Sequence, residues 1–224
     1  MPIALRNGGN DRLDAASSMV DIPSTMEEAH SDLNQRIAER VRGLRAAKGL
    51  SLDALAARSG VSRSMISLVE RGESSPTAVV LEKLATGLDV VLASLFDAPA
   101  VGTEVAGGPI ARSKEQPEWR DPASGYLRRN VSPIGRGQPM QIVEVHFPPG
   151  GRVAFETGVR DVQVFQQVWV LEGRIDISLD GDVHHLHEGD CMAMELDRPT
   201  MFYNPSRQTA RYAVVLVSEP LARK

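Results

Sequence analysis

The 224-residue chain is short of cysteine and of long apolar runs, and each shortage excludes a class of protein. Its one cysteine, Cys191, cannot form a disulfide within the chain, which agrees with a reducing compartment. No stretch reaches the roughly eighteen consecutive apolar residues of a membrane-spanning helix, and the start of the chain lacks the apolar core of a secretion signal. We therefore expect a cytoplasmic protein with no membrane partner.

A net positive charge is missing as well, because 25 Lys and Arg are set against 29 Asp and Glu, giving a formal net charge of −4. The charge is unevenly distributed. Residues 1–32 and 98–224 are net acidic, whereas residues 33–97 carry nine basic against seven acidic side chains. Contact with phosphate groups depends on local charge rather than on the sum over the chain, so the middle segment keeps the capacity to bind nucleic acid.

The sequence divides into four stretches and contains no repeat of solenoid length. Residues 1–30 are polar and acidic without a sustained apolar period, which predicts a flexible N-terminal arm. Residues 31–97 have helical apolar spacing and predict an all-α domain. Residues 98–108 are rich in Pro, Gly and Ala and predict a linker, and residues 109–220 alternate with period two, which predicts an all-β domain.

The helical stretch predicts a bundle of five short helices. The first ends at Gly49, since glycine is the usual residue after a helix, and Ser51 stands in the N-cap position of the second. Ser62 is the N-cap of a third helix. Pro76 begins a fourth helix, and a short fifth helix ends at Phe96.

The strongest motif is LSLDALAARSGVSRSMISLVERGESSP, residues 50–76. Two helices joined by a short turn that contains Gly60 have the helix-turn-helix geometry, in which the second helix enters the major groove. Ala56 supplies a small side chain where the helices cross, and Ile66 and Val69 face the core. A purely structural bundle would explain the apolar stripes, but not a capped third helix that begins with Arg and is rich in Ser.

These residues resemble the XRE family of phage-repressor-like helix-turn-helix proteins, and the resemblance covers residues 33–97. It implies a lambda-repressor-like fold and double-stranded DNA as the partner. It also implies a partly buried ion pair between Arg45 and Glu70 that joins the first helix to the third. Leu68 stands where the family often has a polar base-reading residue, so it either contacts a thymine methyl group or adds little specificity. The DNA-binding residues that the resemblance implies are Ser51, Ser62, Arg63, Ser64, Ser67 and Leu68.

The second half predicts short β-strands separated by turns, which is typical of a closed barrel or a sandwich. The expected strands span residues 126–132, 140–147, 164–171, 174–179, 191–194 and 210–217. Residues 108–218 resemble a small cupin barrel, most closely the small-molecule-sensing domain that often follows an XRE module. The motifs that carry this resemblance are FPPGGRVAF (147–155), VWVLEGRIDISLDG (168–181), HEGDCMAM (187–194) and FYNP (202–205). The expected fold is therefore two domains, an all-α five-helix bundle followed by an all-β cupin-type barrel.

Metal-dependent cupins hold their metal with three His and one Glu. The corresponding positions here are Glu156, Gly158, Gln166 and Thr200, so all three imidazoles are missing. We therefore predict no metal, no cofactor and no catalytic residues. The alternative is a metal-dependent cupin enzyme with an autoregulatory DNA-binding module.

The barrel nevertheless offers a candidate effector pocket. Gln166 and Thr200 are neutral hydrogen-bonding groups of the kind that orient a polar ligand in an apolar pocket. The predicted ligand-binding residues are Glu156, Gln166, Met194, Thr200 and Phe202. Two other interpretations remain open, in which these side chains only fill the barrel or the barrel serves only for dimerisation.

Two further features carry weaker predictions. His184, His185 and His187 lie within four residues, but on a strand His184 points away from the other two, so we expect no metal site there. Cys191 begins a strand, and we expect a small buried side chain.

The whole sequence predicts a homodimeric regulator that binds a palindromic operator and responds to an unknown small-molecule effector. One helix-turn-helix reads only a few base pairs, so two are needed about 34 Å apart to meet successive major grooves.

Overall fold

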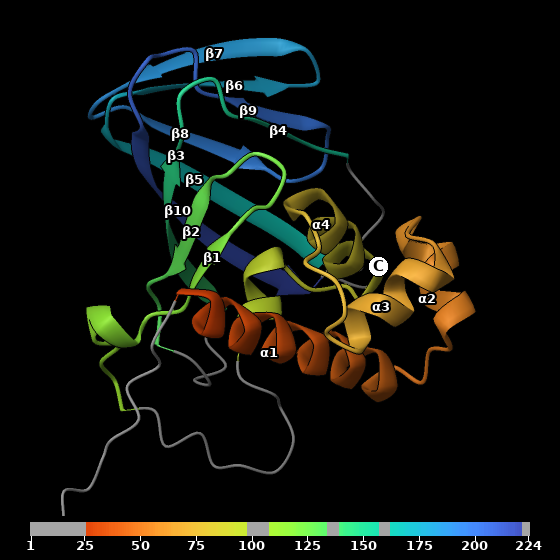
Figure 1. The fold of residues 1–224 in the computed structure, drawn as a ribbon. Helices are drawn as coiled ribbons and strands as arrows, with labels where there is room; N and C mark the ends of the chain where they lie inside the picture. Colours follow the sequence, from red (N-terminus) through yellow and green to blue (C-terminus); the bar gives the residue numbers. More distant parts are fainter. Residues whose placement is uncertain (1–25, 98–107, 134–138, 157–161, 221–224) are drawn as a thin grey trace, which may run out of the picture.

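The computed structural model describes residues 26–97, 108–133, 139–156 and 162–220 (Figure 1). Residues 1–25 of the predicted arm (1–30) lie outside the described residues, and the prediction is wrong for residues 26–30, which begin the first helix. Residues 98–107 of the predicted linker (98–108) also lie outside the described residues. Within the described ranges, no helix is both long and apolar enough to cross a membrane.

The described chain contains four α-helices, not five: α1 (Met26–Ala47), α2 (Leu52–Ser59), α3 (Arg63–Glu70) and α4 (Ala78–Gly87). The fifth predicted helix is a 3-10 helix, η1 (Leu92–Phe96), in which the Ser94 N–H bonds to the Val91 carbonyl at 2.9 Å. Its flanking residues Val91 and Asp97 are extended, and five residues between them are too few for a stable α-helix. α4 begins after Thr77, whose hydroxyl caps the Val80 N–H, rather than at Pro76.

Ten described strands form two antiparallel sheets. The six-stranded sheet has the order β1-β2-β3-β10-β5-β8 and the four-stranded sheet the order β4-β9-β6-β7. The larger sheet contains β1 (Glu118–Arg120), β2 (Leu127–Asn130), β3 (Met140–Phe147), β5 (Val162–Glu172), β8 (Cys191–Glu195) and β10 (Ala210–Pro220). The smaller contains β4 (Arg152–Phe155), β6 (Arg174–Leu179), β7 (Asp182–His187) and β9 (Thr200–Tyr203), and a 3-10 helix, η2 (Ser113–Glu115), precedes β1.

The prediction of a closed barrel is wrong, because no ladder of hydrogen bonds joins the two sheets in the described residues. The sheets instead pack as a sandwich. β3 and β4 are consecutive but lie in different sheets, and the chain passes from one to the other through the turn at Pro149-Gly150. A period of two tells which side chains point inward, but it does not tell whether the edge strands pair.

The buried apolar residues form one cluster that runs through both halves of the chain. Its centre is a file of aromatic rings with centroid separations from 5.7 to 6.3 Å, made by Phe96, Trp119, Tyr126, Phe147, Tyr212 and Phe202. Because Phe96 belongs to η1 and the other rings to the β domain, the helices and the sandwich share their core. Figure 1 shows the helices at one end of the sandwich, with α4 beside the strands.

Polar contacts reinforce this junction. The backbone N–H of Ala78, at the start of α4, donates to the buried Asp121 carboxylate at 2.9 Å. The Asn130 side chain donates to the carbonyl of Ala93 in η1 at 3.4 Å. A residue of the β domain therefore caps a helix of the helical domain.

Candidate DNA-binding surface and effector pocket

The turn between α2 and α3 has the backbone geometry that its sequence predicts. Ser51 accepts a hydrogen bond from the Ala54 N–H at 3.0 Å and caps α2. Gly60 ends α2 with φ of 68°, a left-handed conformation that costs glycine little, and its N–H bonds to the Ala56 carbonyl at 2.9 Å. Ser62 then caps α3 by accepting from the Met65 N–H at 3.2 Å.

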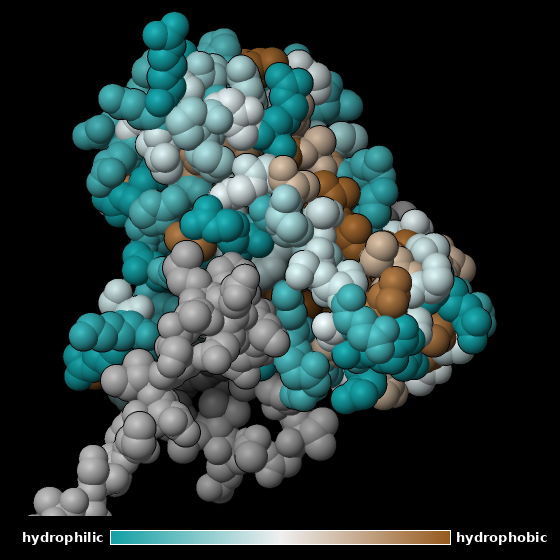
Figure 2. Space-filling view, in the orientation of Figure 1, coloured by the Kyte–Doolittle hydropathy of each residue, from teal (hydrophilic) through white to brown (hydrophobic). Residues whose placement is uncertain are grey.

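The N-terminal end of α3 is exposed to solvent, and one side of the helix packs into the core. Ser62, Arg63 and Ser64 are exposed, whereas Ile66 and Val69 are buried. Ser67 and Leu68 are only partly exposed, so they are less accessible than the three residues at the start. Figure 2 shows that mainly hydrophilic side chains cover the helical domain, with isolated hydrophobic ones among them.

Arg63 is the most prominent cation of this surface. Its Nε lies 3.3 Å from the Asp53 Oδ1, and the two side chains are 65% and 76% exposed. An exposed ion pair of this kind contributes little stability, so Arg63 is free to exchange Asp53 for a phosphate or a base edge.

Sequence reasoning missed a second arginine on the same side of α3. Arg71, the C-cap residue of α3, donates to the Ser67 hydroxyl and forms a two-point ion pair with Glu73 at 2.8 and 2.7 Å. The hydrogen bond from Arg71 lowers the pKa of the Glu73 carboxyl, so the pair stays ionised. The spacing of four residues from Ser67 could have revealed it, since residues four apart on a helix are neighbours.

The structure brings Arg45 and Glu70 together. Two nitrogens of the Arg45 guanidinium contact the two carboxylate oxygens of Glu70 at 2.6 and 2.8 Å, and the third donates to the Leu50 carbonyl at 2.8 Å. The hydrogen bond to Glu70 raises the pKa of Arg45. The pair fixes α3 against α1, so the exposed end of α3 is held in one orientation.

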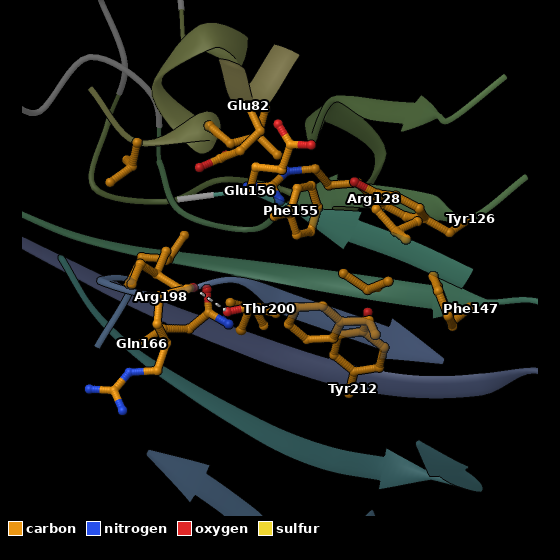
Figure 3. Close-up of a pocket in the computed structure, with 18 residues that line it drawn as sticks. Glu82, Tyr126, Arg128, Phe147, Phe155, Glu156, Gln166, Arg198, Thr200 and Tyr212 are labelled. Carbon is orange, nitrogen blue, oxygen red and sulfur yellow. Dashed lines mark hydrogen bonds between the residues drawn. The ribbon is translucent and has the colours of Figure 1, made fainter. Parts of the chain in front are cut away.

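A cavity of about 80 Å³ lies inside the sandwich at the end that meets α4 and η1 (Figure 3). Of the five predicted ligand-binding residues, Glu156, Gln166, Thr200 and Phe202 line it. Met194 does not line it. That side chain is buried behind Gln166, whose amide nitrogen lies 3.9 Å from the Met194 sulfur.

The cavity also has a charged wall that sequence reasoning missed. Arg128 of β2 and Glu82 of α4 both line it, and both are buried. The alternation of β2 held the signal for Arg128, because Arg128 shares its face with the buried Tyr126 and Asn130. Nothing in the sequence indicates that α4 closes the cavity.

Arg128 is only 6% exposed, and its guanidinium carbon lies 5.4 Å from the centre of the Phe96 ring. Burial lowers the pKa of Arg128, and the neighbouring Tyr126 and Glu82 act in the opposite direction. Burial also raises the pKa of Tyr126 and Tyr212, so both hydroxyls are neutral at physiological pH. The wall therefore carries a buried cation that stays charged, because a guanidinium does not lose its proton in proteins.

The side of the cavity opposite Arg128 is formed by the neutral Gln166 and Thr200 together with Arg198, whose side chain is 52% exposed. Gln166 is buried, and the buried Thr200 donates to the Arg198 carbonyl at 3.1 Å. Glu156 stands at the rim with 77% of its side chain exposed, and it forms an ion pair with Lys83 of α4 at 2.7 Å.

These residues do not fit a metal ion. In the described part of the chain, no three His, Cys, Asp or Glu side chains come close enough to share one, and Gly158 lies outside that part. His184, His185 and His187 are exposed on β7, where the His185 Nδ1 lies 2.8 Å from the Asp176 carboxylate. The prediction of a buried Cys191 is wrong, because this residue is exposed. It stands at the start of the edge strand β8, which among the described strands pairs with β5 alone.

Comparison with known proteins agrees with this geometry. A family profile described as helix-turn-helix matches residues 41–94. The uncharacterised HTH-type transcriptional regulator y4dJ of Sinorhizobium fredii is 37% identical over 59 residues, which are 26% of this chain and 77% of y4dJ. The chain belongs to the XRE family of helix-turn-helix transcriptional regulators.

The likeness to other helix-turn-helix transcriptional regulators extends into the β domain. The HTH-type transcriptional regulator SutR of Escherichia coli is 27% identical over 184 residues, which are 81% of this chain and 94% of SutR. The crystal structure of an HTH_3 family transcriptional regulator from Vibrio cholerae superposes with a TM-score of 0.66 at 24% identity, covering 84% of this chain and 98% of that one. The order of helix-turn-helix domain and cupin-like β-sandwich is therefore shared.

Proposed function

We propose that this XRE-family protein is a dimeric, sequence-specific transcriptional regulator of the cytoplasm that binds a palindromic operator and responds to a small molecule in the β-sandwich. The observation that carries the DNA-binding part is the exposed, serine-capped start of α3, held against α1 by the Arg45–Glu70 pair. A rigid helix with a free N-terminal end is what base reading in the major groove requires.

The side chains divide into three groups by their position. Ser51 and Ser62 begin α2 and α3, where N–H groups and hydroxyls suit phosphate oxygens. Arg63 and Ser64 follow at the exposed end of α3 and are the principal base readers. Ser67 and Leu68 lie one turn further and contribute at the edge of the contact.

The proposed two-fold contact lies on the outer face of the six-stranded sheet, which we call the aromatic face. Phe165 and Trp169 of β5 are 40% and 51% exposed, although β5 alternates with buried residues on its inner side. Trp169 pairs with Ala213 of β10 and with Cys191 of β8, and Phe165 pairs with Val217. An apolar patch of this kind suits a second copy of the chain, and a second helix-turn-helix is what a palindromic operator needs.

The proposed route from effector to DNA runs through α4. This helix lines the cavity with Glu82, contacts the rim through Lys83 and packs against α2 of the DNA-binding motif. A ligand that prefers one position of α4 would change the spacing of the two recognition helices, whereas a ligand with equal affinity for both positions would change nothing. No specific observation favours the enzyme alternative.

The test is to select bound duplexes from a random DNA library with the full chain and to measure affinity for the selected sequence by mobility shift at fixed salt. Arg63→Ala should weaken specific binding about tenfold or more, as loss of a good base contact does. Arg174→Ala, an exposed arginine on β6 of the other domain, is the matched control and should bind like the wild type. Unchanged affinity of Arg63→Ala for the selected duplex would refute α3 as the reading element.

A further inference from the structure

The buried Arg128 has an edge that nothing in the described structure satisfies. Its Nε and Nη2 are shielded from solvent and have no hydrogen-bond acceptor among the described residues. Nε and Nη2 are the two donors on one edge of the guanidinium, and they point in parallel. Buried polar groups normally have partners, and a charged donor without one is costly, so two on the same edge are unusual.

The shape of this edge selects the chemistry of a partner. A carboxylate accepts two parallel N–H bonds from an arginine edge, one on each of its two oxygens. A neutral amide or a hydroxyl has only one acceptor oxygen and cannot do this. Figure 3 shows Arg128 beside Glu82 and Glu156 on one side of the cavity, with Gln166 and Thr200 on the other. In this arrangement the two nitrogens are shielded, so binding requires the guanidinium to rotate toward the cavity.

The rest of the cavity limits the size and polarity of the partner. Its walls near Arg128 are aromatic and aliphatic, with Phe147, Phe155 and Val145 among them. A volume of about 80 Å³ is smaller than the roughly 300–1,000 Å³ of sites for drug-sized ligands. A ligand that fits has few non-hydrogen atoms and a short apolar body.

Resting on the proposed role of the sandwich as a sensor, we infer that the effector is a small organic carboxylate whose carboxyl group binds Arg128. The effector also acts on α4, because the charge of Glu82 attracts Arg128. A ligand carboxylate competes with Glu82 for Arg128. Binding of the ligand therefore weakens the attraction between Arg128 of β2 and Glu82 of α4. Ligand binding and the position of α4 are thereby coupled through a single arginine.

The experiment is calorimetric titration and thermal unfolding of the full chain with straight-chain monocarboxylates from acetate to hexanoate, each compared with its amide at equal ionic strength. At least one acid should bind and raise the unfolding temperature, and its amide should bind about tenfold more weakly or not at all. Arg128→Lys keeps the charge but loses the two-donor edge, so the acid should bind more weakly and the difference between acid and amide should become smaller.

Two variants sharpen this result. Arg129→Lys is the matched control, because Arg129 is the next residue of β2 and lies on its opposite face, where it pairs with Glu144; it should bind the acid like the wild type. Glu82→Gln removes the competing carboxylate and should tighten acid binding. Because the expected effect of Glu82→Gln is tighter binding, a mutation that merely weakens the fold could not produce it.

The outcomes separate this inference from the proposed function. If no acid binds while specific DNA binding is intact, or if an amide binds as well as its acid, the carboxylate inference is wrong. A neutral or cationic metabolite that stabilises the protein and alters operator binding would leave the sensor proposal standing and overturn only the ligand class. Loss of specific DNA binding by the wild-type chain would overturn the proposed function itself.

Discussion

The Nε and Nη2 atoms of Arg45 lie 2.6 and 2.8 Å from the two carboxylate oxygens of Glu70, and both side chains are largely buried. This pair joins the first helix to the third, and the bond from Arg45 to the Leu50 carbonyl extends the connection to the start of α2. One arginine therefore sets the relative position of three elements of the DNA-binding motif.

Arg45→Met should lower the free energy of unfolding by about 3 kcal/mol, because it leaves the Glu70 carboxylate buried without its cation. Urea unfolding followed by circular dichroism measures the change. Glu73→Gln breaks the exposed Arg71–Glu73 pair of similar geometry and should leave stability unchanged. Equal stability of Arg45→Met and the wild type would show that the pair only orients α3.

Two helical glycines should respond to alanine with opposite signs. A Cβ at Gly87 in α4 would lie 2.8 Å from the Ser59 Cβ and 3.1 Å from its Cα, so Gly87→Ala should force α4 away from α2 and destabilise the protein by about 1–3 kcal/mol. A Cβ at Gly43 in α1 meets nothing within 4 Å, so Gly43→Ala should stabilise by about 0.5–1 kcal/mol. Thermal unfolding of both variants checks the signs, and a stabilising Gly87→Ala would contradict this packing.

Acid should destabilise the protein partly through Glu144 on β3. Burial opposes ionisation of this carboxyl, but hydrogen bonds from Arg129 and Arg211 outweigh burial and lower its pKa below the ordinary 4.5. A carboxyl with a lowered folded-state pKa contributes stability above its unfolded pKa and loses that contribution as the pH falls through its folded pKa. Unfolding free energies measured from pH 7 down to pH 3 should therefore decline below about 4.5, the ordinary pKa of glutamate.

Glu144→Gln should be less stable than the wild type at pH 7 and should decline less steeply in acid, since it has no proton to take up at this position. Parallel curves for the two proteins would show that other carboxyls account for the acid sensitivity.

Trp169→Glu should convert the protein from dimer to monomer, because it places a charge on the aromatic face. Light scattering after size-exclusion chromatography should give twice the 24.3 kDa chain mass for the wild type and the single chain mass for the variant. Val183→Glu is the matched control, since Val183 is also 51% exposed but lies on β7 of the other sheet. A monomeric wild type, or a dimeric Trp169→Glu, would rule out this face as the interface.

The sequence predicted local structure well where the pattern is set by neighbouring residues. Caps such as Ser51 and Ser62 act on N–H groups three residues away, so the ends of α2 and α3 follow from the sequence. Strands β3 and β6 were predicted with their full bounds for the same reason, since alternation is a local property. The prediction of a fifth α-helix was wrong because its five residues are too few for a stable α-helix. The prediction of a closed barrel was wrong because pairing between edge strands depends on distant segments.

The candidate pocket was predicted in part for a related reason. Glu156, Gln166, Thr200 and Phe202 were found through the cupin resemblance, which carries information about the β domain alone. Glu82 was missed because its role depends on where α4 packs, and no pattern within residues 78–87 records that the helix closes a cavity whose other walls come mainly from the β domain.

Asp121 of the β domain caps α4 of the helical domain, so the two domains are separate in sequence but are joined in the folded structure. A fragment that stops at residue 97 would lose this cap and would expose Phe96, which packs on Trp119. The helix-turn-helix region and the sandwich should therefore unfold in one cooperative transition, and exchanging either half with a relative would disrupt the other unless the residues at this junction were transferred with it.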